Sequence, residues 1–160
     1  TGTTKEYAKL LSDKLSLPYY SLDEIKNKVK PGGKIIYLGW IMASGVKGYK
    51  KAIKDYDVCA VGAVGMGATG TQVKEVRTKN KIPSSKPVFT LQGGFDVKKL
   101  HGIYKLMMTI MVKTAGKGLA NKQDRTQEED QMLEMMLHGG KYVDEKNLKA
   151  ILDWYGKRGE

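Results

Sequence analysis

The chain begins with four small residues, Thr1, Gly2, Thr3 and Thr4, which lead directly into a helical pattern. Such residues at the start of a helix suit a phosphate. The glycine allows close approach of the backbone, while hydroxyl groups and the first helix N–H groups donate hydrogen bonds. For this tetrapeptide alone, a helix cap that binds nothing is the alternative. The pattern of the remaining sequence is needed to distinguish a phosphate site from a helix cap without a ligand.

Helical and strand patterns alternate along the chain. Continuous apolar runs at residues 34–39, 57–64 and 87–91 predict strands that are covered on both faces. Residues 17–20 indicate a further, shorter strand, and helical spacing predicts helices between the strands. Alternation of this kind is typical of a parallel sheet with helices on both faces, so we predict one α/β domain over residues 1–160.

A glycine-containing segment follows each of the three longer predicted strands. The carboxyl ends of parallel strands lie at one edge of a sheet, where ligands bind to α/β proteins. We therefore expect these segments and the first four residues to form one crevice. The candidate binding residues are Thr1, Gly2, Thr3, Thr4, Gly39, Trp40, Ile41, Met42, Ala43, Gly45, Gly65, Met66, Gly67, Gln92, Gly93 and Gly94.

The order of these segments resembles the flavodoxins, whose FMN phosphate loop has the pattern T/S-x-T-G-x-T. Thr1, Gly2 and Thr4 match the last part of that pattern. Trp40 is similar to the aromatic residue that stacks on the flavin ring in many flavodoxins, and residues 65–67 are similar in position to the second flavin loop. Residues 89–117 resemble a broader flavodoxin-domain group that includes small clostridial-type proteins and quinone-dependent protoporphyrinogen dehydrogenases.

This resemblance implies a flavodoxin-like three-layer sandwich with a parallel sheet in the order 2-1-3-4-5. The first strand of that order is missing from the sequence, so we expect an N-terminally truncated domain. The resemblance also implies non-covalent FMN binding by the candidate residues, and electron transfer as the function. Two alternatives stay open: a flavin-dependent oxidoreductase of the quinone-dependent protoporphyrinogen dehydrogenase type, and a non-redox module that binds anions or nucleic acid.

The chain is strongly basic, with 28 lysines and arginines against 17 acidic residues and a net charge of +11. That excess predicts an anionic ligand or partner and favours acidic proteins as redox partners. Flavodoxins are usually acidic, so the resemblance does not identify the partner. Nucleic acid is a weaker candidate, because the lysines are spread over several elements and are not interleaved with stacking aromatic residues.

A helix is predicted after Phe95, with apolar residues at helical spacing and lysines beside them. We expect it to cover the sheet as a core helix; the alternative is a basic amphipathic face that meets a quinone-bearing or anionic membrane. The single cysteine and the absence of a long apolar run predict a cytoplasmic protein, peripheral to the membrane in that alternative. No histidine, cysteine or serine has catalytic or metal-ligand spacing, so neither a catalytic residue nor a metal site is predicted, and whether the protein is an enzyme stays open.

Overall fold

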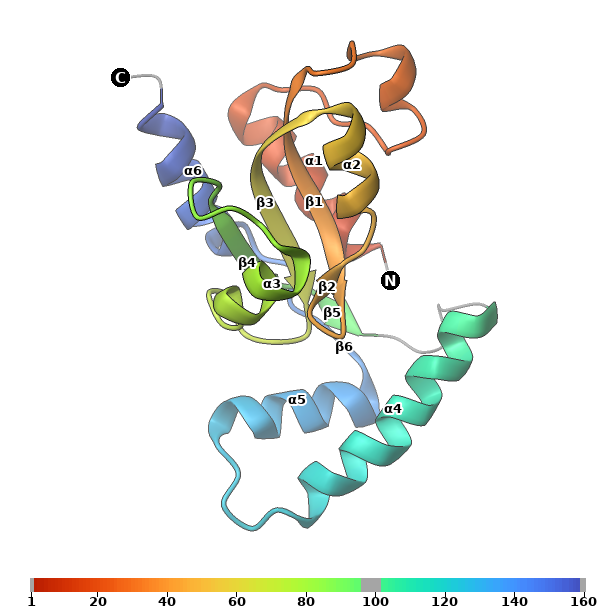
Figure 1. Cartoon of the computed structure of the whole chain (residues 1–160). Helices are drawn as coiled ribbons and strands as arrows, with labels where there is room; N and C mark the ends of the chain where they lie inside the picture. Colours follow the sequence, from red (N-terminus) through yellow and green to blue (C-terminus); the bar gives the residue numbers. More distant parts are fainter. Residues whose placement is uncertain (1, 96–101, 159–160) are drawn as a thin grey trace.

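The computed structural model describes residues 2–95 and 102–158 (Figure 1). Its centre is a four-stranded sheet in the order β2-β1-β3-β4. β1, β3 and β4 are parallel, whereas β2 is antiparallel to the end of β1. The fold is therefore α/β with a mostly parallel sheet, as predicted. The strands are β1 (Lys34–Met42), β2 (Gly45–Val46), β3 (Asp57–Gly65) and β4 (Val88–Gln92).

Helices cover both faces of the sheet. Side chains alternate between the two faces along each central strand, so each face has its own buried apolar cluster. Val61 and Ala63 of β3 pack into a buried cluster with the helices between the strands. Val64, one position further, packs into a second cluster with the first and last helices. The helices of the first cluster are α2 (Tyr49–Asp55) and α3 (Val73–Asn80), and those of the second are α1 (Thr3–Leu15) and α6 (Lys149–Gly156).

Two further helices follow β4 and form a hairpin that projects from the carboxyl edge of the sheet (Figure 1). A short antiparallel pair of strands, β5 and β6, connects this hairpin to the sheet. A capping box begins the second helix: the Glu129 N–H donates to the Thr126 hydroxyl at 3.2 Å. The elements are β5 (Gly94–Phe95), α4 (Gly102–Asn121), α5 (Gln127–His138), β6 (Gly140–Lys141), and 3-10 helices at Ile25–Asn27 and Glu145–Leu148.

The prediction of a strand at residues 17–20 is wrong. The chain after α1 turns back on the helix, because Ser16 adopts a left-handed conformation and the Leu17 N–H donates to the Ser12 carbonyl at 3.2 Å. Pro18 has no N–H to give to a sheet, and Leu17, Tyr19 and Tyr20 remain exposed. Along residues 34–39, no strand in the described part of the chain pairs with the edge of β1 that faces away from β3.

The prediction that the helix after Phe95 covers the sheet is also wrong. α4 packs mainly against α5, and Leu106 and Ile110 on it are exposed. The first residues of that predicted helix, including Leu100, lie outside the described residues. Nothing in the described ranges 2–95 and 102–158 is a helix long and apolar enough to cross a membrane.

Candidate functional site

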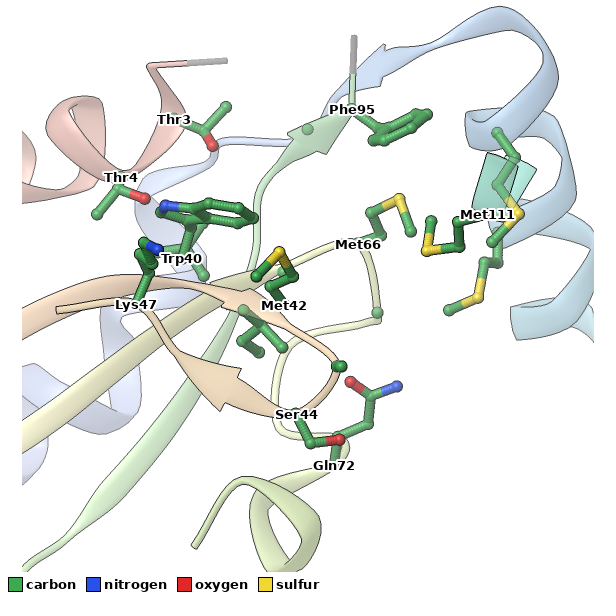
Figure 2. Close-up of a pocket in the computed structure, with 18 of the residues that line it drawn as sticks. Thr3, Thr4, Trp40, Met42, Ser44, Lys47, Met66, Gln72, Phe95 and Met111 are labelled. Carbon is green, nitrogen blue, oxygen red and sulfur yellow. The ribbon is translucent and has the colours of Figure 1, made fainter. Parts of the chain in front are cut away.

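A cavity of about 800 Å³ lies at the carboxyl ends of β1, β3 and β4, beside the start of α1 (Figure 2). Four segments that are distant in sequence meet there, as the sequence analysis predicted. The hairpin of α4 and α5 closes the side away from the sheet. The predicted residues that line it are Gly2, Thr3, Thr4, Trp40, Ile41, Met42, Ala43, Gly65, Met66, Gly67 and Gly94.

Four other predicted residues do not line this cavity, and Thr1 lies outside the described residues. Gly39 has a packing role, because a Cβ there would be 2.7 Å from Val46 Cγ1. Gly45 begins the short strand β2. Gln92 lines a neighbouring cavity instead, and Gly93 lies close to Val64 and Thr3, which do line the main cavity.

One side of the cavity is polar and positively charged. Thr4 lies beside Trp40 and Lys47 there (Figure 2), and Lys5 also lines the cavity. α1 begins after Gly2, whose φ of 83° turns the chain into the helix. The positive end of the helix dipole is therefore directed at this side, which favours an anion. Among the described lining residues there are two lysines and no aspartate or glutamate.

The other side of the cavity is apolar. Met66 and Met111 lie together there (Figure 2), and the buried ring of Phe95 closes one end. Two further methionines, Met132 and Met136, come from α5. Thioether side chains are polarizable and adapt to flat aromatic surfaces. The cavity therefore combines a cationic, hydroxyl-bearing side with a soft apolar side.

A β-hairpin forms one wall, where the sequence analysis expected the strand to end at residue 39 and a glycine-containing segment to follow. β1 continues through Trp40 to Met42, and a two-residue turn leads into β2. Ala43 and Ser44 in this turn have φ values of 47° and 61°, which are costly for residues other than glycine. Surrounding contacts must hold the turn in this conformation.

Asn80 supplies those contacts from the end of α3. Its side-chain oxygen accepts the Val46 N–H at 2.8 Å, and its amide donates to the carbonyls of Ser44 at 2.9 Å and Val76 at 2.7 Å. The Asn80 side chain is buried, so water cannot take over these hydrogen bonds, and loss of the side chain would leave the turn's polar groups without partners. Tyr37 holds the next residue in place, since its hydroxyl donates to the Lys47 carbonyl at 2.6 Å; burial raises the pKa of Tyr37 to about 12.

The segment after β3 is held against β4 by hydrogen bonds. The Gly70 N–H donates to the Thr90 carbonyl at 3.1 Å, and the Thr90 hydroxyl donates to the Thr71 carbonyl at 2.6 Å. The Thr69 hydroxyl accepts the Gln92 N–H at 2.9 Å. These bonds fix a wall formed by small and apolar residues.

Gly93 lies between the start of α1 and the end of β3. Its N–H donates to the Gly65 carbonyl at 2.8 Å, and its own carbonyl accepts the Tyr142 N–H at 2.8 Å. A Cβ at this position would lie 2.6 Å from Val64 Cγ1 and 3.0 Å from Thr3 Oγ1. A glycine here lets the first turn of α1 approach the ends of β3 and β4.

Tyr7 of α1 holds the end of β4 next to Gly93 in place. Its hydroxyl donates to the Gln92 carbonyl at 2.5 Å and accepts a hydrogen bond from the Asn147 amide at 2.7 Å. Burial raises the pKa of Tyr7, and the bond from Asn147 opposes that rise. The neutral hydroxyl thus links α1, β4 and the segment before α6.

Sequence reasoning missed nine of the lining residues. Lys5, Ser44 and Val64 are immediate neighbours of predicted residues, so wider segments would have included them. The methionines of α4 and α5 gave no local signal, because their place at the cavity depends on where the hairpin packs. The missed residues are Lys5, Ser44, Lys47, Val64, Gln72, Phe95, Met111, Met132 and Met136.

The arrangement suits binding of an amphipathic anion more than acid–base or metal chemistry. No group of histidine, cysteine, aspartate and glutamate side chains that could hold a metal ion occurs in residues 2–95 and 102–158. Comparisons of the chain with models of protein families, with curated proteins and with solved structures gave no match.

Proposed function

We propose that the chain is a flavodoxin-like domain that binds FMN without a covalent bond and transfers electrons. The observation that carries this proposal is the polarity of the cavity. FMN is a flat apolar ring system with an anionic phosphate tail. Hydroxyls, lysines and a helix start lie on one side, and Trp40 and the methionines supply the apolar surfaces.

The size and donor set of the cavity fit this cofactor. A volume of about 800 Å³ lies within the range of cofactor sites. Thr3 and Thr4 would hold the phosphate with the start of α1, and Trp40 would stack on the ring. Nothing lies within 4 Å of the Cβ that a side chain at Gly2 would have, so there is open space at the start of the helix.

The proposed fold is a three-layer flavodoxin-like sandwich. β1, β3 and β4 would be the strands 3, 4 and 5 of the order 2-1-3-4-5, because they lie side by side and parallel in that order. Strand 1 of that order would pair with the edge of β1 along residues 34–39, where no strand pairs among the described residues.

In this proposal FMN supplies the redox chemistry, and the chain binds it, orients it and sets its electrostatic environment. The positive charge of the chain favours acidic proteins as redox partners. We place this activity in the cytoplasm, as expected for a chain with one cysteine.

Titration with FMN tests the proposal. We expect stoichiometric quenching of flavin fluorescence, and about tenfold weaker binding when Trp40→Ala removes the stacking surface. Trp154→Phe is the control, because Trp154 packs on Phe89 with ring centroids 6.0 Å apart and lines no part of the cavity. A folded wild-type chain that leaves flavin fluorescence unchanged would refute FMN binding.

A second cavity favours the alternative function, a flavin-dependent oxidoreductase that acts on a quinone or protoporphyrinogen. It has a volume of about 310 Å³ and shares Met66, Gly67, Gln72 and Met132 with the main cavity. A substrate in this space would lie next to the cofactor, whereas an electron carrier needs only an exposed flavin edge. Steady-state turnover of a quinone by the FMN-loaded chain would support the enzyme over the carrier.

The charge around the cavity predicts the potential of bound FMN. Lysines without carboxylates stabilise the anionic reduced form, so we expect a midpoint potential above that of acidic flavodoxins. Ser44→Asp should lower this two-electron potential by about 35 mV relative to Ser44→Asn, since a unit charge about 10 Å away contributes roughly 1.7 kcal/mol at an effective dielectric constant of about 20. Both side chains tolerate the left-handed turn. Equal potentials for the two variants in a redox titration would contradict this explanation.

A further inference from the structure

The helical hairpin of α4 and α5 leaves apolar side chains in solvent. α4 has 20 residues and α5 has 12, so α4 extends beyond the end of its neighbour (Figure 1). Leu106 and Ile110 on α4 are 61% and 54% exposed, and Leu137 on α5 is 58% exposed. Two helices alone bury only one side of each, and bundles of four helices solve this problem.

The two helices carry opposite charge. α4 contains three lysines and no acidic residue, whereas α5 contains four acidic residues and neither lysine nor arginine. Lys113 and Lys117 are exposed, and neither forms an ion pair with any residue that the structure describes. Glu134 is also exposed, and among the described residues its one ionic contact is with His138 at 3.8 Å.

The outward residues of the two helices have matching spacing. Ile110, Lys113 and Lys117 follow one another on α4 at intervals of three and four residues, which places them on one side of a helix. On α5, Leu137, Glu134 and Asp130 have the same intervals in the reverse direction.

An antiparallel pair of such helices would therefore place apolar opposite apolar and lysine opposite carboxylate. Ile110 would meet Leu137, Lys113 would meet Glu134, and Lys117 would meet Asp130. Asp130 already accepts a bond from Arg125 at 2.6 Å, and a carboxylate has acceptor capacity for a second cation.

We propose that a second copy of this chain covers the hairpin. The two copies pair about a two-fold axis, with α4 of each against α5 of the other, and form an antiparallel four-helix bundle. A two-fold interface uses the same surface on both copies, so every pairing above occurs twice. This proposal does not depend on the identity of the ligand in the cavity.

The charges favour a second copy over an anionic lipid surface. Lipid headgroups would attract the lysines of α4 but repel the four acidic residues of α5 on the same hairpin. A second copy presents both signs of charge in the required positions. Pairing would also hold the wall of the cavity, because Met111, Met132 and Met136 come from these two helices.

Sedimentation equilibrium on the whole chain tests the pairing. We expect a concentration-dependent dimer, and about tenfold weaker association for Lys113→Glu or Glu134→Lys, because each places like charges together at two symmetric sites. Lys54→Glu makes the same charge change on α2, away from the hairpin, and should leave association unchanged. Far-UV circular dichroism checks that each variant remains folded.

Mixing the two variants gives the decisive result. A dimer of one Lys113→Glu chain with one Glu134→Lys chain restores a lysine–glutamate pair at both sites, so the mixture should associate as strongly as the wild type. Failure of the mixture to recover, or a wild-type monomer that persists to millimolar concentration, would overturn the proposal. Binding of a monomeric wild type to phosphatidylserine vesicles would overturn it in favour of a lipid surface.

Discussion

Replacing Asn80 with leucine is expected to lower the free energy of unfolding by about 3 kcal/mol. Leucine has nearly the same volume, so the change removes hydrogen bonds without leaving a large cavity. The Val46 N–H and the Ser44 carbonyl would both lose a buried partner. The Val76 carbonyl keeps its place in the α3 helix ladder, so it contributes little to the loss.

Urea denaturation followed by far-UV circular dichroism measures this change. Asn27→Leu is the matched control, since Asn27 is exposed and its side chain forms no hydrogen bond within the described residues. Asn80→Asp should give an intermediate loss, because it keeps an acceptor for Val46 but cannot donate to Ser44. Equal stability of wild type and Asn80→Leu would mean that the left-handed turn at Ala43 and Ser44 does not need the hydrogen bonds of Asn80.

The central strands could be predicted because their apolar runs are continuous and separated by helices. β1 was predicted to stop at Gly39, and the structure extends it to Met42. The strand was expected to end at this glycine, but its missing side chain accommodates Val46 of the paired strand β2 and the Lys47 carbonyl that follows it. A glycine in a strand can mark close approach of another backbone, and local sequence does not separate that role from a turn.

Elements that depend on distant packing could not be predicted in the same way. An apolar spacing predicted α4 as a helix, but spacing does not say which surface covers it, and the hairpin with α5 left Leu106 and Ile110 exposed. The same limit explains the missed methionines at the cavity. Four local segments predicted the floor and the polar side, whereas the opposite wall comes from the hairpin.

Replacing Gly93 with alanine is expected to weaken FMN binding by about tenfold, with a smaller effect on folding. The new Cβ would lie 2.6 Å from Val64 Cγ1 and 3.0 Å from Thr3 Oγ1. Val64 is fixed within the sheet, so the first turn of α1 has to move away from the cavity. Gly118→Ala is the control, because nothing lies within 4 Å of the Cβ that it would add.

Riboflavin, which lacks the phosphate, separates displacement of α1 from general damage to the cavity. If the start of α1 holds the phosphate, Gly93→Ala should weaken binding of FMN and leave binding of riboflavin nearly unchanged. Equal losses for the two ligands would mean that the substitution deforms the ring side of the cavity. No loss for either would mean that α1 takes no part in binding, and that Thr3 and Thr4 are a helix start without a ligand.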